Sequence, residues 1–580
     1  MGRSLLAARI GVAALSTSAL LTAAPGLAQN VPLAPTRDEL TRDQPTPETR
    51  PPSLNVVGDI ERSPCPLADP KFADVRLTIN DVVFNNLKGA SVAEMRAAWA
   101  PYAGTERPVA IICEIRDAAA TMLRQKGYLA AVQVPTQKIE NGIVRFEVLY
   151  ARVTTVRARG QVSGAEAKIA GYLSKLTEDE IFDRNRAERY LLLARDLPGY
   201  NVQLTLKPAG TGPGELIGEV SVLRRPYAVD VTIQNLAARQ TGRWGGQVRA
   251  QAYGLTGLGD ASYVSVYSTS DFDEQQILEA GHSFRPGSEG LTIDGRFTYA
   301  WTKPDFDAGP GVPDIKARTL FATLGVSYPF RRTQAFNLTL AGGLDLVNQK
   351  VKFFGPLTDD KLRILWLSAE IDGVDLRSRR PKWRYGASLE LRKGLDILGA
   401  SGDCGCGLGS TLPDRSRVDG EATATVIRAA ASGELALGES FAFALNPRAQ
   451  IAFDPVLSFE EFTAGNYTVG RGYDPATLAG DSGVGVSAEL RGPHLSPIDQ
   501  SKLLIQPYIF ADAAWVWNKN IGGDPEHLLS VGGGVRADLT DRLHIDATVA
   551  VPTQKAGLLD RRGDTRFLLT LTSRLLPWRS

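Results

Sequence analysis

The segment LHIDATVAV, residues 543–551, alternates apolar with polar side chains. A period of two places successive side chains on opposite faces of a β-strand, so the segment predicts a strand with one apolar face. Residues 296–301, 504–517 and 529–539 alternate in the same way, and helical periodicity is lost from about residue 228 onward. The C-terminal part of the chain is therefore predicted to be all-β.

These strands fit a membrane barrel better than a soluble β-sandwich, the other architecture that gives alternation. Charged residues lie on the narrower face, segments are about ten residues long, and Trp515 and Trp517 occupy interface positions. At roughly 22 residues for each strand and its connection, residues 226–580 would form about 16 antiparallel strands. Long polar or glycine-rich loops at 303–316 and 399–417 alternate with short turns, as two rims require.

The N-terminus, residues 1–28, has the pattern of a cleaved secretory signal. Basic residues flank the apolar stretch 10–21, and a small residue ends the segment. Residues 29–62 are rich in proline and are predicted to be an extended linker, in which Thr36 and Glu39 can cap a short helix. The mature chain is therefore expected to be exported.

The formal net charge is +1. A protein that binds nucleic acid usually concentrates basic residues on one element, and this chain has no such excess, so nucleic acid is not expected as a partner. The chain also lacks a P-loop of the form G-x-x-x-x-G-K-[ST]. No nucleotide or other cofactor is predicted.

Two small α/β units are predicted between the linker and the barrel. Residues 63–150 have a β-α-α-β-β pattern, with a first strand at 75–79 and helices at 91–100 and 109–125. Residues 151–225 repeat this order. Units of this kind leave sheet edges free, which suits the recognition of an extended peptide by strand addition.

Export would place the four cysteines in an oxidising compartment. They are Cys65, Cys113, Cys404 and Cys406. Four cysteines allow three pairings, and proximity in the sequence favours the first with the second and the third with the fourth. A metal site is the alternative, but the histidines lie far from the cysteines in the sequence. Structural disulfides are expected and no metal site, with the connectivity left open.

Residues 480–483 read GDSG, the sequence of the serine-protease nucleophile loop. That chemistry requires a histidine and a buried aspartate beside the serine. His282 lacks the flanking residues of a protease histidine loop, and no G-x-S-x-G elbow precedes a helix. Four-residue matches are frequent in a chain with 57 glycines. No catalytic residue is therefore predicted.

A second interpretation accounts for the same residues. The stretch PVLSFEEFTAGNYTVGRGYDPATLAGDSGVGVSAELRGP, residues 455–493, resembles the signature region of the outer-membrane transporters of two-partner secretion. This is the ShlB/FhaC/HecB haemolysin secretion/activation type, also called TpsB, in the BamA-type superfamily of POTRA modules joined to a barrel. The resemblance implies a hairpin at 465–483 inside the barrel, with Arg471, Gly472 and Tyr473 at its tip. GDSG then forms the turn into the next strand.

A buried arginine needs a carboxylate, and a bidentate partner also fixes its direction. Residues 507–513, PYIFADA, resemble the family strand whose Phe510 and Asp512 face the hairpin arginine. Asp512 falls on the face opposite the apolar side chains of that strand. We therefore predict that Arg471 pairs with Asp512, with Glu489 as the second candidate.

The resemblance covers nearly the whole mature chain. Residues 125–148 are similar to the second half of the family's first POTRA module. The matching residues, which the resemblance implies for client binding, are Gly127, Tyr128, Pro135 and Gln137. Cys65 and Cys113 match the family disulfide, and residues 257–260 match the first barrel hairpin.

Some residues depart from the family pattern. Gly470 intervenes between Val469 and the tip arginine, and Tyr150-Ala151 replaces Glu-Gly at the end of the first module. Many members carry a plug helix at the mature N-terminus, whereas the prolines here leave room for about two turns. Trp578 is expected to replace the usual aromatic last residue as insertion signal.

Together these features predict periplasmic α+β POTRA modules followed by a transmembrane β-barrel in the outer membrane of a Gram-negative cell. The function expected is the transport of one unfolded exoprotein, bearing an N-terminal secretion domain, from periplasm to surface. Outer-membrane lipid and the barrel-assembly machinery are the other expected partners, and the chain is expected to be a monomer without enzyme activity. The alternatives are a sister insertase or assembly factor and, from another class, a passive porin. The client and the resting state of the pore are left open.

Overall fold

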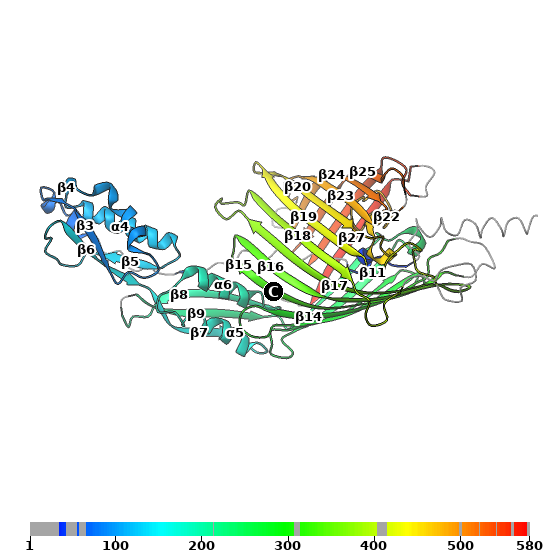
Figure 1. Ribbon diagram of the computed structural model, residues 1–580, viewed down its shortest axis with the longest axis horizontal. Coiled ribbons are helices and arrows are strands. Elements are labelled where there is room, and N and C mark those ends of the chain that lie inside the picture. Colours follow the sequence, from blue (N-terminus) through cyan, green and yellow to red (C-terminus); the bar gives the residue numbers. More distant parts are fainter. Residues whose placement is uncertain are drawn as a thin grey trace, which may run out of the picture.

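The computed structural model shows two small α/β units beside one large barrel (Figure 1). It describes residues 34–41, 55–56, 65–212, 214–306, 314–402, 414–497, 502–520, 522–540, 542–557 and 562–576. The predicted signal at residues 1–28, together with Cys404, Cys406 and Trp578, lies outside the described residues.

The first α/β unit, residues 65–150, packs helices on a three-stranded sheet. Its elements are η1 (Pro66–Ala68), η2 (Pro70–Phe72), β2 (Arg76–Thr78), β3 (Asp81–Asn85), α3 (Val92–Met95), η3 (Arg96–Ala98), η4 (Ala100–Tyr102), β4 (Glu106–Pro108), α4 (Ile111–Gln125), β5 (Ala130–Gln133) and β6 (Ile143–Tyr150). In the sheet β6 is central, parallel to β3 and antiparallel to β5. Ile112, Leu123 and Phe146 are fully buried between α4 and this sheet.

The predicted β-α-α-β-β order is incomplete in this unit. The strand expected at 75–79 is β2, which pairs only with β4 and lies outside the main sheet. The missed strand is β3, whose five residues DVVFN give too short an alternation to stand out beside β2. The helix expected at 91–100 is a single α-helical turn, α3, continued by 3-10 turns.

A disulfide joins Cys65 to Cys113, with 5.9 Å between their Cα atoms. Cys113 lies in the first turn of α4, and Cys65 precedes η1. The bridge closes a loop over 48 positions of sequence. A crosslink of this kind typically stabilises the folded state by about 2–4 kcal/mol, because it reduces the conformational freedom of the unfolded chain.

The second α/β unit follows directly and contacts the barrel. Its elements are β7 (Arg152–Gly160), α5 (Glu166–Ser174), α6 (Arg184–Arg195), β8 (Tyr200–Pro208) and β9 (Glu215–Arg224). Asp183 caps α6 by accepting a hydrogen bond from the Asn185 amide. The sheet order is β1-β8-β9-β7, and β1 (Asn55–Val56) belongs to the linker that precedes the first unit. The linker therefore contains one short strand, parallel to β8.

The remaining chain forms a closed antiparallel barrel of sixteen strands. The barrel strands are β10 (Tyr227–Gln234), β11 (Gly245–Tyr253), β12 (Ala261–Thr269), β13 (Gln275–Phe284), β14 (Thr292–Thr302), β15 (Lys316–Arg332), β16 (Phe336–Phe353), β17 (Gly355–Val374), β18 (Trp383–Gly394), β19 (Thr425–Leu437), β20 (Phe441–Ala452), β23 (Ser482–Arg491), β24 (Leu503–Trp517), β25 (Glu526–Leu539), β26 (Leu543–Pro552) and β27 (Arg566–Leu576). β10 pairs with β27 and closes the barrel, so the predicted fold class is confirmed. A short 3-10 turn, η5 (Arg239–Thr241), lies between β10 and β11.

The two faces of the barrel wall differ in polarity. On β15, for example, Leu324 and Val326 point outward and are exposed, whereas Thr319 points inward and is buried. Trp515 and Trp517 are likewise exposed on the outer face. An apolar outer face and a polar interior are expected of a barrel that lies in lipid.

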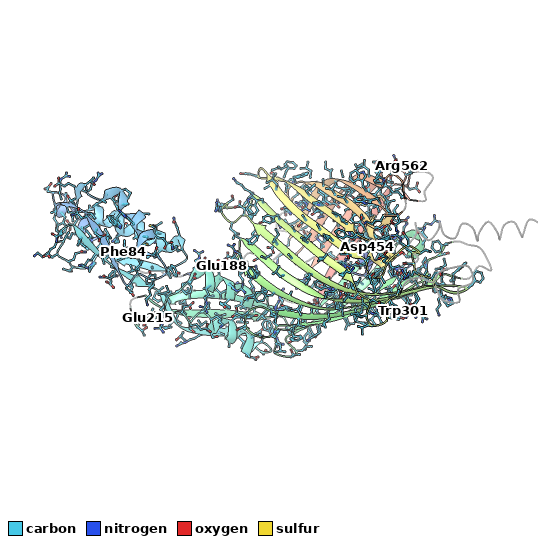
Figure 2. All side chains as sticks on the ribbon, in the orientation of Figure 1. Phe84, Glu188, Glu215, Trp301, Asp454 and Arg562 are labelled. Carbon is cyan, nitrogen blue, oxygen red and sulfur yellow. A yellow bond between two sulfur atoms is a disulfide. The ribbon has the colours of Figure 1, made fainter. Side chains whose placement is uncertain are left out.

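The second α/β unit marks the periplasmic end of the barrel. Asp196, just after α6, forms a bidentate ion pair with Arg332 at the β15–β16 turn, at 2.7 and 2.8 Å. Glu188 accepts a hydrogen bond from the Gln334 amide of the same turn, and Figure 2 labels it where the unit meets the barrel. The described parts of the β14–β15 and β18–β19 connections, residues 303–306, 314–315, 395–402 and 414–424, lie at the opposite end. Within the described residues no helix is long and apolar enough to span a bilayer.

Candidate functional site

The connection between β20 and β23 folds back into the barrel as a hairpin. It contains η6 (Ser458–Glu460) and the antiparallel strands β21 (Phe462–Ala464) and β22 (Leu478–Gly480). Gly470, the residue that departs from the family motif, has a φ of +123°, and a Cβ there would lie 2.7 Å from Leu528 Cδ1. Glycine therefore allows the turn that aims the next residue at the barrel wall.

Arg471, at the hairpin tip, contacts the wall through all of its guanidinium nitrogens. Nη2 and Nε donate to Asp512 Oδ1 and Oδ2 at 2.7 and 3.0 Å, and the backbone amide donates to Oδ2 at 2.9 Å. Nη1 donates to Glu489 Oε1 at 2.7 Å. The guanidinium carbon lies 3.6 Å from the ring centroid of Phe510. Asp512 is 1% exposed, so the pair is screened from bulk water.

Gly472 and Tyr473 extend this contact along the wall. The Gly472 amide donates to Ser530 Oγ, and a Cβ at this glycine would lie 2.8 Å from Pro552 N. The Tyr473 hydroxyl lies 2.9 Å from two backbone carbonyl oxygens, of Leu529 and Gln554. The structure thus brings together the six hairpin and wall residues singled out in the sequence.

Sequence reasoning missed two arginines of this network. Glu489 accepts from Arg536 at 3.0 and 3.1 Å and from Arg491 at 3.0 Å, in addition to the tip arginine. Arg536 also pairs with Asp546 at 3.1 Å. The only signal in the sequence was the inward phase of these side chains on alternating strands, which does not identify partners.

The base of the hairpin is held by a second cluster that the sequence did not predict. Arg392 on β18 is 2% exposed and donates to Asp345 on β16 at 2.7 Å. It also donates to Glu460 of the hairpin at 2.8 and 3.1 Å and to Glu390 at 2.6 Å. Arg428 on β19 donates to the Glu460 carbonyl at 3.0 Å. Across the contact between hairpin and wall, the wall supplies the arginines and the hairpin supplies the carboxylate of Glu460, beside the wall's own Asp345 and Glu390.

The GDSG residues close the hairpin at this base. Asp481 is fully buried and pairs with Arg417. Its carboxylate also accepts from the backbone amides of Val456 and Lys519, each at 2.8 Å. Ser482 Oγ accepts from the Ala452 amide at 3.1 Å. Both polar side chains of the motif therefore bond to loop or wall backbone.

A short segment of the linker, residues 34–41, lies inside the lumen beside the hairpin base (dark blue in Figure 1). It forms one helical turn, α2 (Arg37–Leu40), with the predicted capping box of Thr36 and Glu39. Leu40 packs with Phe321 of the wall and Phe459 of the hairpin. The segment is shorter than the two turns for which the sequence left room.

Polar contacts hold this segment on both sides. Arg37 pairs with Glu390 at 3.3 Å, and Asp38 pairs with Arg448 of the wall at 3.2 Å. The Thr463 hydroxyl of the hairpin donates to Asp38 at 2.5 Å. Both lumenal elements therefore contact each other and the barrel wall.

The four residues that the resemblance marks for client binding are divided between two places. The Gly127 carbonyl accepts from the Arg184 amide, and Tyr128 forms a bridge with Asp183, so both lie at the junction of the two α/β units. Pro135 lies beside Gln137, whose side chain donates to the Pro135 carbonyl at 3.4 Å. The Gln137 side chain also pairs with the backbone amide and carbonyl of Arg145 on β6, both at 2.7 Å. It thereby continues the pairing of β6 beyond the end of β5 at Gln133.

The described residues contain no cluster of three or more side chains that could hold a metal ion. The chemistry of this site is instead that of buried ion pairs between two inserted elements and a wall. Such contacts can position the inserts and can be broken and remade without any covalent step.

Comparison with known proteins agrees with this architecture. Residues 220–537 match the family described as haemolysin secretion/activation protein ShlB/FhaC/HecB, and residues 77–150 match the ShlB-type POTRA domain. The heme/hemopexin transporter protein HuxB of Haemophilus influenzae Rd is 22% identical over 472 residues, 78% of this chain and 79% of the relative. HuxB of strain 86-028NP is 21% identical over 534 residues, 89% and 90% of the two chains.

Solved structures share the fold at low sequence identity. The structure of CdiB from Escherichia coli aligns with a TM-score of 0.72 at 17% identity, over 89% of this chain and 94% of that one. CdiB from Acinetobacter baumannii aligns with a TM-score of 0.64 at 17% identity, over 93% and 95%. The matched family is one of secretion transporters rather than of enzymes. The chain therefore belongs to the ShlB/FhaC/HecB haemolysin secretion/activation family and is an outer-membrane transporter of two-partner secretion.

Proposed function

We propose that this chain moves one unfolded exoprotein from the periplasm to the cell surface through the barrel lumen. We assign residues 1–28 to a cleaved signal and 29–62 to a linker. Segment 34–41 of this linker would act as a plug of the pore. Residues 63–150 and 151–225 form two periplasmic POTRA modules, and 226–580 form the barrel with the lumenal hairpin 465–483. The exoprotein would carry an N-terminal secretion domain, and the chain itself would act as a monomer without catalytic chemistry.

One observation supports this proposal above the others: the lumen contains two elements that are held by side-chain contacts. The hairpin between β20 and β23 is anchored by buried ion pairs at both ends, Arg471–Asp512 at the tip and Arg392–Glu460 at the base. Segment 34–41 is held by two ion pairs of partly exposed groups, by hydrogen bonds from Thr463 to Asp38 and from Gln349 to the Pro35 carbonyl, and by the apolar side chain of Leu40. Partly exposed pairs contribute only about 0–1 kcal/mol each, so segment 34–41 is the element that can leave.

The linker also gives a route by which client capture could release this plug. Among the described residues, two of β1 pair with β8, which has nine residues, so the described chain leaves most of that sheet edge uncovered. An extended client strand that pairs with β8 would replace β1 and gain more backbone hydrogen bonds. Because β1 and α2 lie on the same linker, displacing β1 would loosen the tether of the plug.

A reversible crosslink tests this route. Asn55 and Thr205 are register partners on adjacent strands, which lie about 4.8 Å apart, within the span of a disulfide. Asn55→Cys/Thr205→Cys should block secretion when oxidised and restore it when reduced. Each single cysteine variant, treated identically, controls for reduction of the native bridge. Full secretion by the oxidised double variant would show that β1 does not need to leave β8.

The elements inside the lumen argue against a function as a passive porin. A diffusion pore needs an open aqueous path, whereas the inward faces here contact a hairpin, a linker segment and their ion pairs. The proposed gate also yields a direct test. Deletion of residues 34–41 should raise the conductance of the purified protein while secretion continues. An unchanged conductance would mean that this segment does not restrict the pore.

A further inference from the structure

Four basic side chains gather on the outer surface of the barrel, away from the lumen. They are Lys316 and Arg318 on β15 and Lys350 and Lys352 on β16, and all four are exposed. The strand register sets Lys316 directly opposite Lys352 and Arg318 directly opposite Lys350. Like charges at opposed positions of an antiparallel pair destabilise the sheet, because their Cβ atoms are only about 5 Å apart.

The strand phase places these residues toward lipid and not toward the pore. Lys316 and Arg318 share the outward face of β15 with Leu324 and Val326, whereas Thr319 points inward. The apolar part of that face ends at Leu320, and the basic residues follow at once. They therefore lie at the rim of the apolar band, at the depth of lipid headgroups.

An aromatic neighbour fixes which leaflet this is. Trp301 on β14 is the register partner of Arg318, is 41% exposed and packs at a tilt against Tyr299, with 4.6 Å between ring centroids. Figure 2 labels it toward the end of the barrel that is remote from the α/β units. Exposed tryptophans form the interface belt of membrane barrels. The basic residues adjoin the outer-leaflet belt because the α/β units mark the periplasmic side.

The protein itself neutralises little of this charge. Lys350 pairs with Asp359 at 3.1 Å. Within the described part of the chain, Lys316, Arg318 and Lys352 have no carboxylate at ion-pair distance, and the nearby Asp314 pairs with Lys303 instead. The cluster thus has four cations to one paired carboxylate on a rigid two-stranded surface.

We propose that this cluster binds the phosphate groups of phosphorylated glycolipids in the outer leaflet. Lysine and arginine form charge-assisted hydrogen bonds with phosphate oxygens, and one arginine can bind a phosphate in a bidentate manner. The site faces sideways into the bilayer plane, so a lipid headgroup can reach it with its acyl chains against Leu320 and Leu324. A soluble acidic segment would have to approach across the headgroups.

Binding of purified bisphosphorylated lipid A to the detergent-solubilised protein, followed by native mass spectrometry, tests this site. The variant K316Q/R318Q/K350Q/K352Q should bind roughly 10- to 100-fold more weakly. The matched control R377Q/R379Q/R380Q/K382Q removes the same charge from exposed residues of the periplasmic β17–β18 turn and should bind as wild type. Equal binding by the first variant, or an equal loss in the control, would overturn the proposal.

Further experiments distinguish a lipid phosphate from a soluble anion and control for misfolding of the variant. Dephosphorylated lipid A should bind the wild-type protein weakly. Its affinity should match that of bisphosphorylated lipid A for K316Q/R318Q/K350Q/K352Q. Inorganic pyrophosphate, or an acidic peptide, that competes at equal concentration would assign the site to a soluble anion instead. The charge-preserving variant K316R/K350R/K352R should retain binding even if the glutamine variant does not fold. Loss of binding in that folded variant would contradict recognition by charge.

Discussion

The two ends of the lumenal hairpin are held by arginines of opposite origin. At the tip, Arg471 belongs to the hairpin and its carboxylate partner, Asp512, belongs to the wall. At the base, Arg392 belongs to the wall and its partner, Glu460, belongs to the hairpin. Both clusters are buried, so the two ends are anchored by similar chemistry with the direction reversed.

The ends differ in what else they contact. Among the contacts described, the plug segment meets the hairpin at its base, where Arg37 and Arg392 share the carboxylate of Glu390. Thr463, near that base, also bonds to Asp38 of the plug. The tip has no such link to residues 34–41 among the contacts described. We therefore expect plug release to change the charge balance at the base and to leave the tip in place.

The largest effect is expected at the tip. Arg471→Ala would leave Asp512 buried without its cation, and breaking a buried pair in this way costs about 3–5 kcal/mol. The barrel should still insert, because its strand pairing is unaffected, but secretion of the exoprotein should be lost. Immunoblotting of the medium beside heat-modifiable migration of the barrel measures both. Normal secretion would remove the tip from the transport mechanism.

The base should be less sensitive to a single change. Arg392→Ala removes the cation shared by Asp345 and Glu460, but Arg428 remains 3.3 Å from Glu460. We expect secretion to fall without being abolished and hairpin residues to become accessible to added protease. Arg491→Ala, which removes one of the arginines that share Glu489 in the tip network, is the comparison at the other end. A more severe defect in Arg392→Ala than in Arg471→Ala would reverse the ranking of the two ends.

A smaller effect is expected from the plug contacts. Arg37→Ala/Asp38→Ala removes two partly exposed pairs worth about 0–1 kcal/mol each, which corresponds to a change of up to roughly 30-fold in the closed-to-open ratio. The open probability in planar bilayers should rise while both hairpin anchors persist. Lys138→Ala/Glu140→Ala, an exposed pair in the first α/β unit, is the matched control. An equal rise in the control would show that the effect is not specific to the plug.

The smallest effect is expected at the solvent-exposed pair of Glu94 and Lys126, whose contribution to stability can be compared with that of the buried pairs. Hydrogen bonds from Lys126 and Ser91 lower the pKa of Glu94 from 4.5 to about 2. A lowered pKa in the folded state stabilises the protein above pH 4.5, and this contribution is lost as the pH falls toward 2. Unfolding of the first unit, followed by its fluorescence, should therefore depend less on pH in this window in Glu94→Gln. An unchanged pH dependence would show that the pair is not linked to folding.

The contrast between tip and base also explains what the sequence could reveal. Strand alternation predicted the barrel, and the tip residues were found because Arg-Gly-Tyr and Glu489 lie in one stretch that resembles the family, 455–493, and Asp512 lies in a second, 507–513. Arg392, Asp345 and Glu460 lie on separate segments, and only the closed barrel brings them together. Strand pairing across long sequence separations is not encoded in local periodicity.

Local signals failed where tertiary contacts decide the structure. β1 has two residues, and it is a strand only because β8 offers an edge. Tyr128 bridges to Asp183 of the next unit, a contact that local periodicity does not reveal, and its role in client binding stays a prediction. By contrast, the capping box of Thr36 and Glu39 located α2 correctly, because capping is a local property.

Two elements fill the lumen: segment 34–41, a removable plug that contacts the hairpin base, and the hairpin itself, which is anchored at its tip and its base. Planar-bilayer conductance of wild type, of a deletion of residues 34–41 and of a deletion of 466–481 tests this arrangement directly. We predict a small flickering current for wild type, a larger one without the plug, and a large steady current without the hairpin. A large steady current in all three proteins would place both elements outside the pore and contradict this account.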